Sequence, residues 1–188
     1  MRINMMEIGG ADILAQAVAG RAVFRKLLEM TEREPPEPCP AFLDFGGVEV
    51  ATASFLREAT LAFRDAMRSR HSNFYPVVAN ANEVVREELL ELLRSRGDVL
   101  MTCRLEESGR ITDMVPLGDL EPKQKLTFDL VCRHGETDAG ALMRLHSDGE
   151  NVQRTAWNNR LSALAGLGLV VEVSQGRTKR YRPLLVGP

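Results

Sequence analysis

The 188-residue sequence predicts a mixed α/β (or α+β) fold that ends in a helix-turn-helix and a β-hairpin. Strand-like and helix-like patterns alternate over the first two thirds of the chain, and three helical patterns and a hairpin follow. Residues 1–120 hold 14 basic and 19 acidic residues, whereas residues 121–188 hold 10 and 7. This change of composition predicts two domains, over residues 1–118 and 119–188.

In the first domain, a weak alternation of apolar and polar residues over positions 2–8 predicts a strand. Apolar residues near helical spacing over positions 11–32 predict a helix that Gly20 bends or breaks. Prolines between Pro35 and Pro40 exclude a helix, and an apolar run over residues 41–50 predicts a buried strand. Two more helices are expected, one from Thr52 or Ser54 to Arg70 and one capped by Asn80 or Asn82. Further strands are expected at residues 74–79, 99–105 and 111–115.

In the second domain, residues 116–122 predict a linker and residues 123–134 a first helix. Thr137 is expected to cap the second helix. In the third helix Trp157, Leu161 and Leu164 recur at the spacing of one helical face, which indicates that the single tryptophan is a core residue. Leu126, Leu130, Val131, Leu142 and Leu145 are expected on the inner faces of the first two helices.

The opposite face of the third helix is polar and carries Arg154, Thr155, Asn158 and Asn159. Adjacent asparagines disfavour a helix interior by several tenths of a kcal/mol each, so some other gain should offset them. Arginine and asparagine on an exposed helix read base edges in the DNA major groove. The alternative is an ordinary solvated face.

The hairpin that follows carries Arg177, Lys179, Arg180 and Arg182 around or beyond its Gln175-Gly176 turn. Such cations can hold DNA phosphates. Alternatively, they protect an edge strand against aggregation, and both interpretations are compatible.

Residues 122–185 resemble the winged helix-turn-helix domains of bacterial transcription regulators. The stretch Thr155-Ala156-Trp157-Asn158-Asn159-Arg160-Leu161, followed by Leu167-Gly168-Leu169-Val170, is similar to their recognition helix and the entry to their wing. The resemblance implies that Arg154, Thr155, Asn158 and Asn159 face the groove of double-stranded DNA. It also implies that Arg177, Lys179 and Arg180 lie along the DNA backbone. Some winged helices bind proteins instead, and many act as homodimers on paired half-sites.

The stretch from Phe42 to Phe55 resembles the STAS-like family, relatives of the anti-sigma-factor antagonists, and the resemblance extends over residues 1–105. It implies a mixed sheet with helices and a regulatory serine at a strand-to-helix junction. Thr52-Ala53-Ser54-Phe55 stands where the antagonists have Asp-Ser-Ser-Gly, so Ser54 would be the phosphoacceptor. The implied partner is a histidine-kinase-like ATPase or a sigma-factor regulator. The alternative is that Ser54 or Thr52 only caps the helix.

Three histidines and three cysteines show no metal-ligand spacing, and no catalytic arrangement is evident. We therefore expect neither an enzyme nor a cofactor. The chain also lacks a membrane-spanning apolar run and a secretory signal, which predicts a cytoplasmic protein without a membrane partner. The leading hypothesis is a DNA-binding transcriptional regulator with a STAS-like interaction domain. The alternative is a partner-switching protein whose winged helix is a docking surface.

Overall fold

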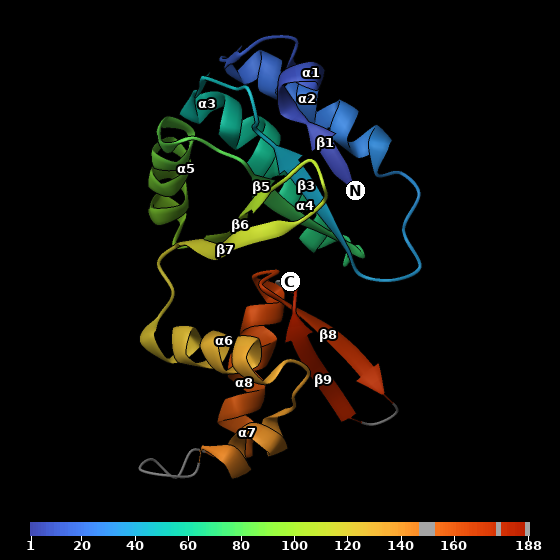
Figure 1. Ribbon diagram of the computed structural model, residues 1–188, viewed down its shortest axis with the longest axis vertical. Helices are drawn as coiled ribbons and strands as arrows, with labels where there is room; N and C mark the ends of the chain where they lie inside the picture. Colours follow the sequence, from blue (N-terminus) through green and yellow to red (C-terminus); the bar gives the residue numbers. More distant parts are fainter. Residues whose placement is uncertain (147–152, 176–177, 187–188) are drawn as a thin grey trace. The chain divides into compact units, whose positions relative to one another are not determined.

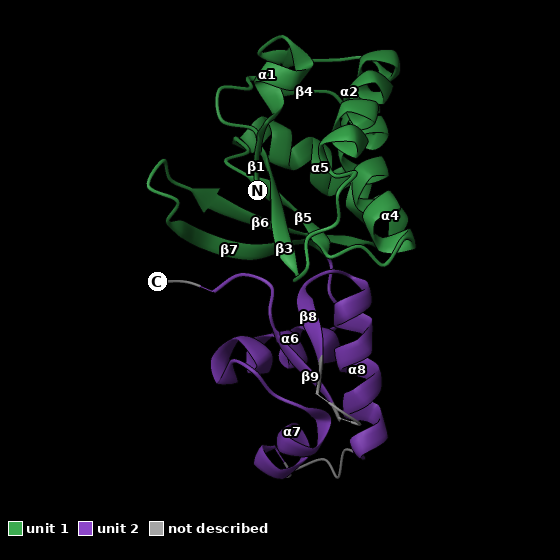
Figure 2. Ribbon diagram, turned by 90° about the vertical axis from the view of Figure 1, so that its right-hand side faces the viewer, with its two compact units in different colours: residues 1–118, 187–188 green, residues 119–186 purple. Residues whose placement is uncertain are grey.

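The computed structural model describes residues 1–146, 153–175 and 178–186. The chain divides into two compact units, residues 1–118 and residues 119–186, which are coloured separately in Figure 2. Each unit has its own mixed or antiparallel strand pairing and its own helices. We describe each unit by itself.

Unit 1 contains a five-stranded sheet in the order β1-β3-β5-β6-β7. Its strands are β1 (Arg2–Asn4), β3 (Cys39–Asp44), β5 (Phe74–Ala79), β6 (Val99–Leu105) and β7 (Ile111–Gly118). The first four strands are parallel to their neighbours, and β7 returns antiparallel to β6. A separate parallel ribbon pairs β2 (Ile13–Leu14) with β4 (Val50–Ala51).

The helices of unit 1 lie along one face of this sheet (Figure 2). They are α1 (Met5–Gly9), α2 (Ala17–Met30), α3 (Ala53–Leu56), a π-helical segment (Arg57–Leu61), α4 (Ala62–Ser69) and α5 (Glu83–Arg96). Each crossover connection between successive parallel strands leads to the adjacent position in the sheet, always in the same direction. Because such crossovers are right-handed, successive crossover helices fall on the same face. The core lies between them and the sheet, where Leu27, Leu43, Phe55, Phe63 and Leu89 are buried.

The sequence-based boundaries at the start of unit 1 are wrong in two places. The first strand ends at Asn4, because its side-chain oxygen accepts hydrogen bonds from the backbone N–H groups of Met6 and Glu7 and starts α1. The helix expected over residues 11–32 begins only at Ala17, since residues 13 and 14 pair with β4. Gly20 does not break α2, and it allows close packing, because a Cβ atom there would lie 2.8 Å from the carbonyl oxygen of Phe55.

The strand expected over residues 41–50 is also shorter, and β3 ends at Asp44. Gly47 then takes a left-handed φ of +84°, which suits glycine, and β4 forms as a separate piece. At the other end of the unit, β7 extends to Gly118, so the linker expected over residues 116–122 is confined to the residues before α6 (Pro122–His134). The expected strand at residues 74–79 and the Asn82 cap of α5 are confirmed.

A buried ion-pair cluster joins α4 to the start of β6. Arg64 is only 1% exposed, and its guanidinium contacts the carboxylates of Asp65 and Asp98. Arg68 donates to the other oxygen of Asp98 at 3.2 Å. Burial opposes ionisation of Asp98, but the charges of Arg64 and Arg68 and the backbone N–H of Val99 outweigh it and hold the pKa of Asp98 below its usual value. In this cluster the arginines serve the fold, because each cationic side chain contacts a carboxylate.

The described residues of unit 2 form three helices and a hairpin (Figure 1). After α6 come α7 (Ala139–Leu145), α8 (Arg154–Gly166), β8 (Val170–Gln175) and β9 (Thr178–Pro183). Thr137, between α6 and α7, exchanges two backbone hydrogen bonds of 2.8 Å with Tyr181 of β9. This bridge ties the segment between the first two helices to the hairpin.

Three expectations about the helices of unit 2 are wrong. Leu126 and Leu145 are 52% and 57% exposed, so they do not face the core. The inner face of α6 passes through Thr127 and Phe128 instead, with Leu130 and Val131 as expected. Asp138, and not Thr137, caps α7, because its carboxylate accepts from the N–H groups at positions 140 and 141. The backbone of Thr137 instead forms the bridge to Tyr181 of β9.

Candidate functional site

The polar face of α8 is the candidate interface. Arg154, Thr155, Asn158 and Asn159 are all exposed, and they lie one helical turn apart in two adjacent pairs. Within the described residues, none of the four side chains makes a hydrogen bond or an ion pair. The structure therefore brings the four predicted residues of α8 together on one accessible face.

The inner side of α8 fixes the orientation of that face. Trp157 is 2% exposed, which confirms the prediction that it is a core residue, and Leu161 and Leu164 are fully buried. The guanidinium carbon of Arg160 lies 4.9 Å from the centre of the Trp157 ring, so Arg160 stacks on the tryptophan. With one side of the helix held in this way, the opposite side cannot turn inward.

The N-terminal end of α8 lies against α7. A Cβ atom on Gly140 of α7 would stand 3.9 Å from the guanidinium carbon of Arg154. Gln153 precedes the helix without a side-chain cap, so the first backbone N–H groups of α8 have no intrahelical acceptor. The positive end of the helix dipole and an exposed arginine favour an anionic contact there. Residues 147–152, between α7 and α8, lie outside the described residues.

The basic hairpin differs from α8, because two of its cations, Lys179 and Arg180, contact carboxylates. The ammonium of Lys179 lies 2.8 Å from a carboxylate oxygen of Glu172, and the hydrogen bond and charge of Glu172 raise the pKa of Lys179. Arg180 contacts Glu136 at 2.9 Å. Arg177, the third predicted phosphate contact, lies outside the described residues. A phosphate would therefore have to compete with these two carboxylates for Lys179 and Arg180.

Ser54, the predicted phosphoacceptor, lies in the first turn of α3. Thr52 is the helix cap, because its hydroxyl accepts a hydrogen bond from the N–H of Phe55. The hydroxyl of Ser54 lies 3.2 Å from that of Thr52, and a Glu88 carboxylate oxygen accepts from the N–H of Ala53. Glu88 thus occupies the place where a helix N-terminus would attract a phosphate, and its charge would repel one.

The thiols and imidazoles form no reactive group. Burial, helped by Asp44, raises the pKa of Cys103 to about 11, and burial with Asp129 raises that of Cys132 to about 11. Both thiols are therefore protonated at neutral pH. His134 and His146 place their Nε2 atoms 3.3 Å apart, but the described residues hold no group of three or more metal-ligating side chains. None of the described helices is both long and apolar enough to cross a membrane.

The sequence interpretation missed a polar network at the carboxyl ends of β3, β5 and β6. Asp44 is 2% exposed and accepts hydrogen bonds from Arg2, from the N–H of Gly46 and from the side-chain amide of Asn80. The same amide donates to the carbonyl of Leu105, and its oxygen accepts from the Leu105 N–H. The available signal was a polar residue at the end of one buried strand, Asp44, and another directly after the next, Asn80, at the edge where open parallel sheets bind ligands.

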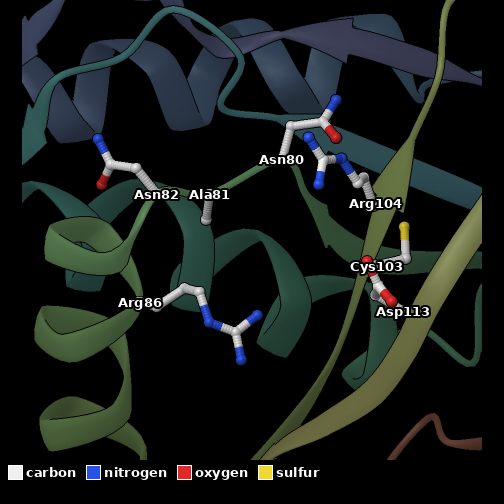
Figure 3. A pocket seen from close by; sticks show the side chains of 7 residues that line it. All are labelled: Asn80, Ala81, Asn82, Arg86, Cys103, Arg104 and Asp113. Atoms are coloured by element: carbon white, nitrogen blue, oxygen red, sulfur yellow. The ribbon is translucent and has the colours of Figure 1, made fainter.

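A hollow of about 420 Å³ opens beside this network. Figure 3 shows the residues that line it: Asn80, Ala81, Asn82, Arg86, Cys103, Arg104 and Asp113. None of these residues was identified as a ligand site from the sequence. The hollow lies entirely within unit 1. Comparisons of the whole chain with models of known protein families, with curated proteins and with solved structures find no match.

Proposed function

We propose that the chain is a DNA-binding transcriptional regulator, in which unit 2 is a winged helix-turn-helix and unit 1 is a STAS-like interaction or signalling domain. The single observation that carries the proposal is the face of α8, where four predicted base-contacting side chains are exposed and unpartnered within the described residues. Arginine pairs with guanine and asparagine with adenine in the major groove.

The order of elements in unit 2 supports the proposal. Two helices precede α8, a one-residue bridge joins Thr137 to the hairpin, and the hairpin follows α8 directly. This is the order of a winged helix-turn-helix, in which the third helix enters the groove and the hairpin contacts the backbone. Because Lys179 and Arg180 are paired with Glu172 and Glu136, the hairpin adds less to DNA affinity than its charge suggests.

Selection of bound duplexes from a random pool, followed by titrations at several salt concentrations, tests the proposal. We expect a consensus site, with affinity that falls steeply as salt rises because phosphate contacts release counterions. Arg154→Ala with Asn158→Ala should lower the affinity for the consensus site by about tenfold or more and relax the consensus. Arg110→Ala, at an exposed arginine of unit 1, serves as the control.

The outcomes separate this function from the alternative. Absence of duplex binding at low salt would contradict the proposal and leave unit 2 as a protein-docking domain. Binding that Arg154→Ala with Asn158→Ala leaves unchanged would show that α8 is not the reading helix. In the partner-switching alternative, Ser54→Asp should disrupt a complex with a kinase-like ATPase or a sigma-factor regulator, and Ser54→Ala should not.

A further inference from the structure

The hollow in unit 1 combines two arginines that lack carboxylate partners. Arg86 extends from α5 and Arg104 from β6, and both side chains border the same space (Figure 3). Within the described residues neither forms an ion pair. Among the residues that the structure describes, the polar contact of Arg86 is a long one, 3.5 Å to the hydroxyl of Thr102. Arg64 and Arg96 of the same unit, in contrast, each contact at least one carboxylate.

The strand geometry explains why the two guanidinium groups share one space. Arg104 and Thr102 are two residues apart on β6, so they lie on the same face of the sheet. Arg86 reaches Thr102 from α5, which packs on that face. Arg104 is therefore directed to the side of the sheet on which α5 begins.

The opposite wall is formed by an irregular part of β7. The register between β6 and β7 shifts between Thr102 and Arg104, so that β7 carries one extra residue. Asp113, in this bulge, has a left-handed φ of +50°, and its carboxylate has no ion-pair partner among the described residues. The charged lining is thus two guanidinium groups and one carboxylate, with a net positive charge.

The third wall is the segment that leads from β5 into α5. Asn82 caps α5 and uses its amide to donate to the carbonyls of Val48 and Glu49. The N–H groups of Glu83 and Val84 open the helix and have no intrahelical acceptor. The positive end of a 14-residue helix therefore adds to the field of the two arginines.

From this arrangement we propose that the hollow binds a small molecule that carries a carboxylate or phosphate group, held by Arg86 and Arg104, with a hydroxyl or amine of the ligand on Asp113. Guanidinium groups bind both oxyanions through paired charge-assisted hydrogen bonds. The volume of about 420 Å³ is that of a small-metabolite site. The site does not depend on DNA binding by unit 2.

Titration of the full-length protein with inorganic phosphate and, separately, with succinate tests the site by ¹H–¹⁵N NMR. Sodium chloride at matched ionic strength is the reference. We expect saturable shifts at Asn80, Ala81, Arg104 and Asp113 for at least one of the two anions, and the one that saturates identifies the oxyanion. Shifts that neither anion saturates, or that chloride reproduces, would overturn the proposal.

Variants assign the binding to the two arginines. Arg86→Gln with Arg104→Gln should weaken binding by tenfold or more, whereas Arg110→Gln, which removes an exposed arginine outside the hollow, should leave it unchanged. Asp113→Asn should strengthen binding severalfold, because it removes the like charge and asparagine tolerates a left-handed φ. This second variant keeps the test decisive if the double variant does not fold. Equal affinity in all variants would overturn the proposal.

Discussion

Two regions of the molecule differ in whether their polar side chains have partners within the fold. Around Asp98 in unit 1, the buried guanidinium of Arg64 faces two carboxylates. On α8 in unit 2, Arg154 and Asn158 are exposed and have no partner among the described residues. A polar group that is satisfied inside the fold contributes to stability, whereas an unsatisfied exposed group is free to bind something else. Substitutions should therefore affect stability in the first region and binding in the second.

The largest effect is expected from Asp98→Asn. The substitution leaves the buried Arg64 with a single half-exposed carboxylate partner, Asp65. Removal of one member of a buried pair costs about 3–5 kcal/mol of the free energy of unfolding. Urea denaturation of the variant measures the loss, and Asp113→Asn, at an exposed and unpaired carboxylate, should change the stability by less than about 0.5 kcal/mol. Equal losses in the two variants would show that the buried ion pair stabilises the fold no more than an exposed carboxylate does.

The pH dependence of the free energy of unfolding should reflect the ionisation of the Asp98 carboxylate. The folded-state pKa of Asp98 is below its unfolded value of about 3.9. The stability that its ionised form provides is therefore fully present above the unfolded pKa, and it is lost as the pH falls through the lower folded pKa. Unfolding curves measured across this acidic range should be steeper in pH for the wild type than for Asp98→Asn. Parallel curves would contradict the ion-pair assignment.

Thr52 and Ser54 provide a smaller comparison, between a hydroxyl that caps a helix and a neighbouring hydroxyl that does not. Thr52→Ala removes the cap of α3 and should lower the free energy of unfolding by about 1 kcal/mol. Ser54→Ala should cost less than about 0.5 kcal/mol, because within the described part of the chain its hydroxyl bonds to Thr52 alone. Thermal or chemical denaturation of both variants measures the difference. A larger loss for Ser54→Ala would show that Ser54 stabilises the helix itself.

The smallest effect on stability is expected on α8. Alanine is the better helix former, so Asn158→Ala with Asn159→Ala should leave the free energy of unfolding unchanged or raise it by several tenths of a kcal/mol. The same variant should weaken binding to the selected duplex. A loss of stability above about 1 kcal/mol would indicate that the asparagines serve the fold, and the proposed recognition face would then lose its main support.

Periodicity in the sequence predicted the elements whose apolar faces are long and regular. It placed β5 and α8 correctly and put Trp157 in the core, because three or more apolar positions repeat along each element. It failed at short pieces such as α1, where one side chain, Asn4, decides between strand and helix. Pairing of two residues in β2 depends on a partner 37 residues further along the chain, and no local pattern records it.

The two candidate sites could be predicted from the sequence to different degrees, again because a local pattern is visible in the sequence and a contact between distant residues is not. The polar face of α8 lies within one helix, so its spacing is visible in the sequence. The hollow in unit 1 is lined by residues from the β5–α5 turn, α5, β6 and β7. Arg86 and Arg104 become neighbours only because α5 packs on the sheet beside β6. Likewise, the pairing of Lys179 and Arg180 depends on how the hairpin returns past Glu172 and Glu136.

The side chain of Asn80 continues the sheet beyond the last residue of β5. Its amide gives one hydrogen bond to the Leu105 carbonyl and takes one from the Leu105 N–H, as a backbone residue of a neighbouring strand would. An asparagine side chain can do this because its amide offers both a donor and an acceptor in one planar group. The wall of the hollow at Asn80 is thereby ordered before any ligand arrives. Entry of a ligand would then cost little conformational entropy on this side, which favours affinity.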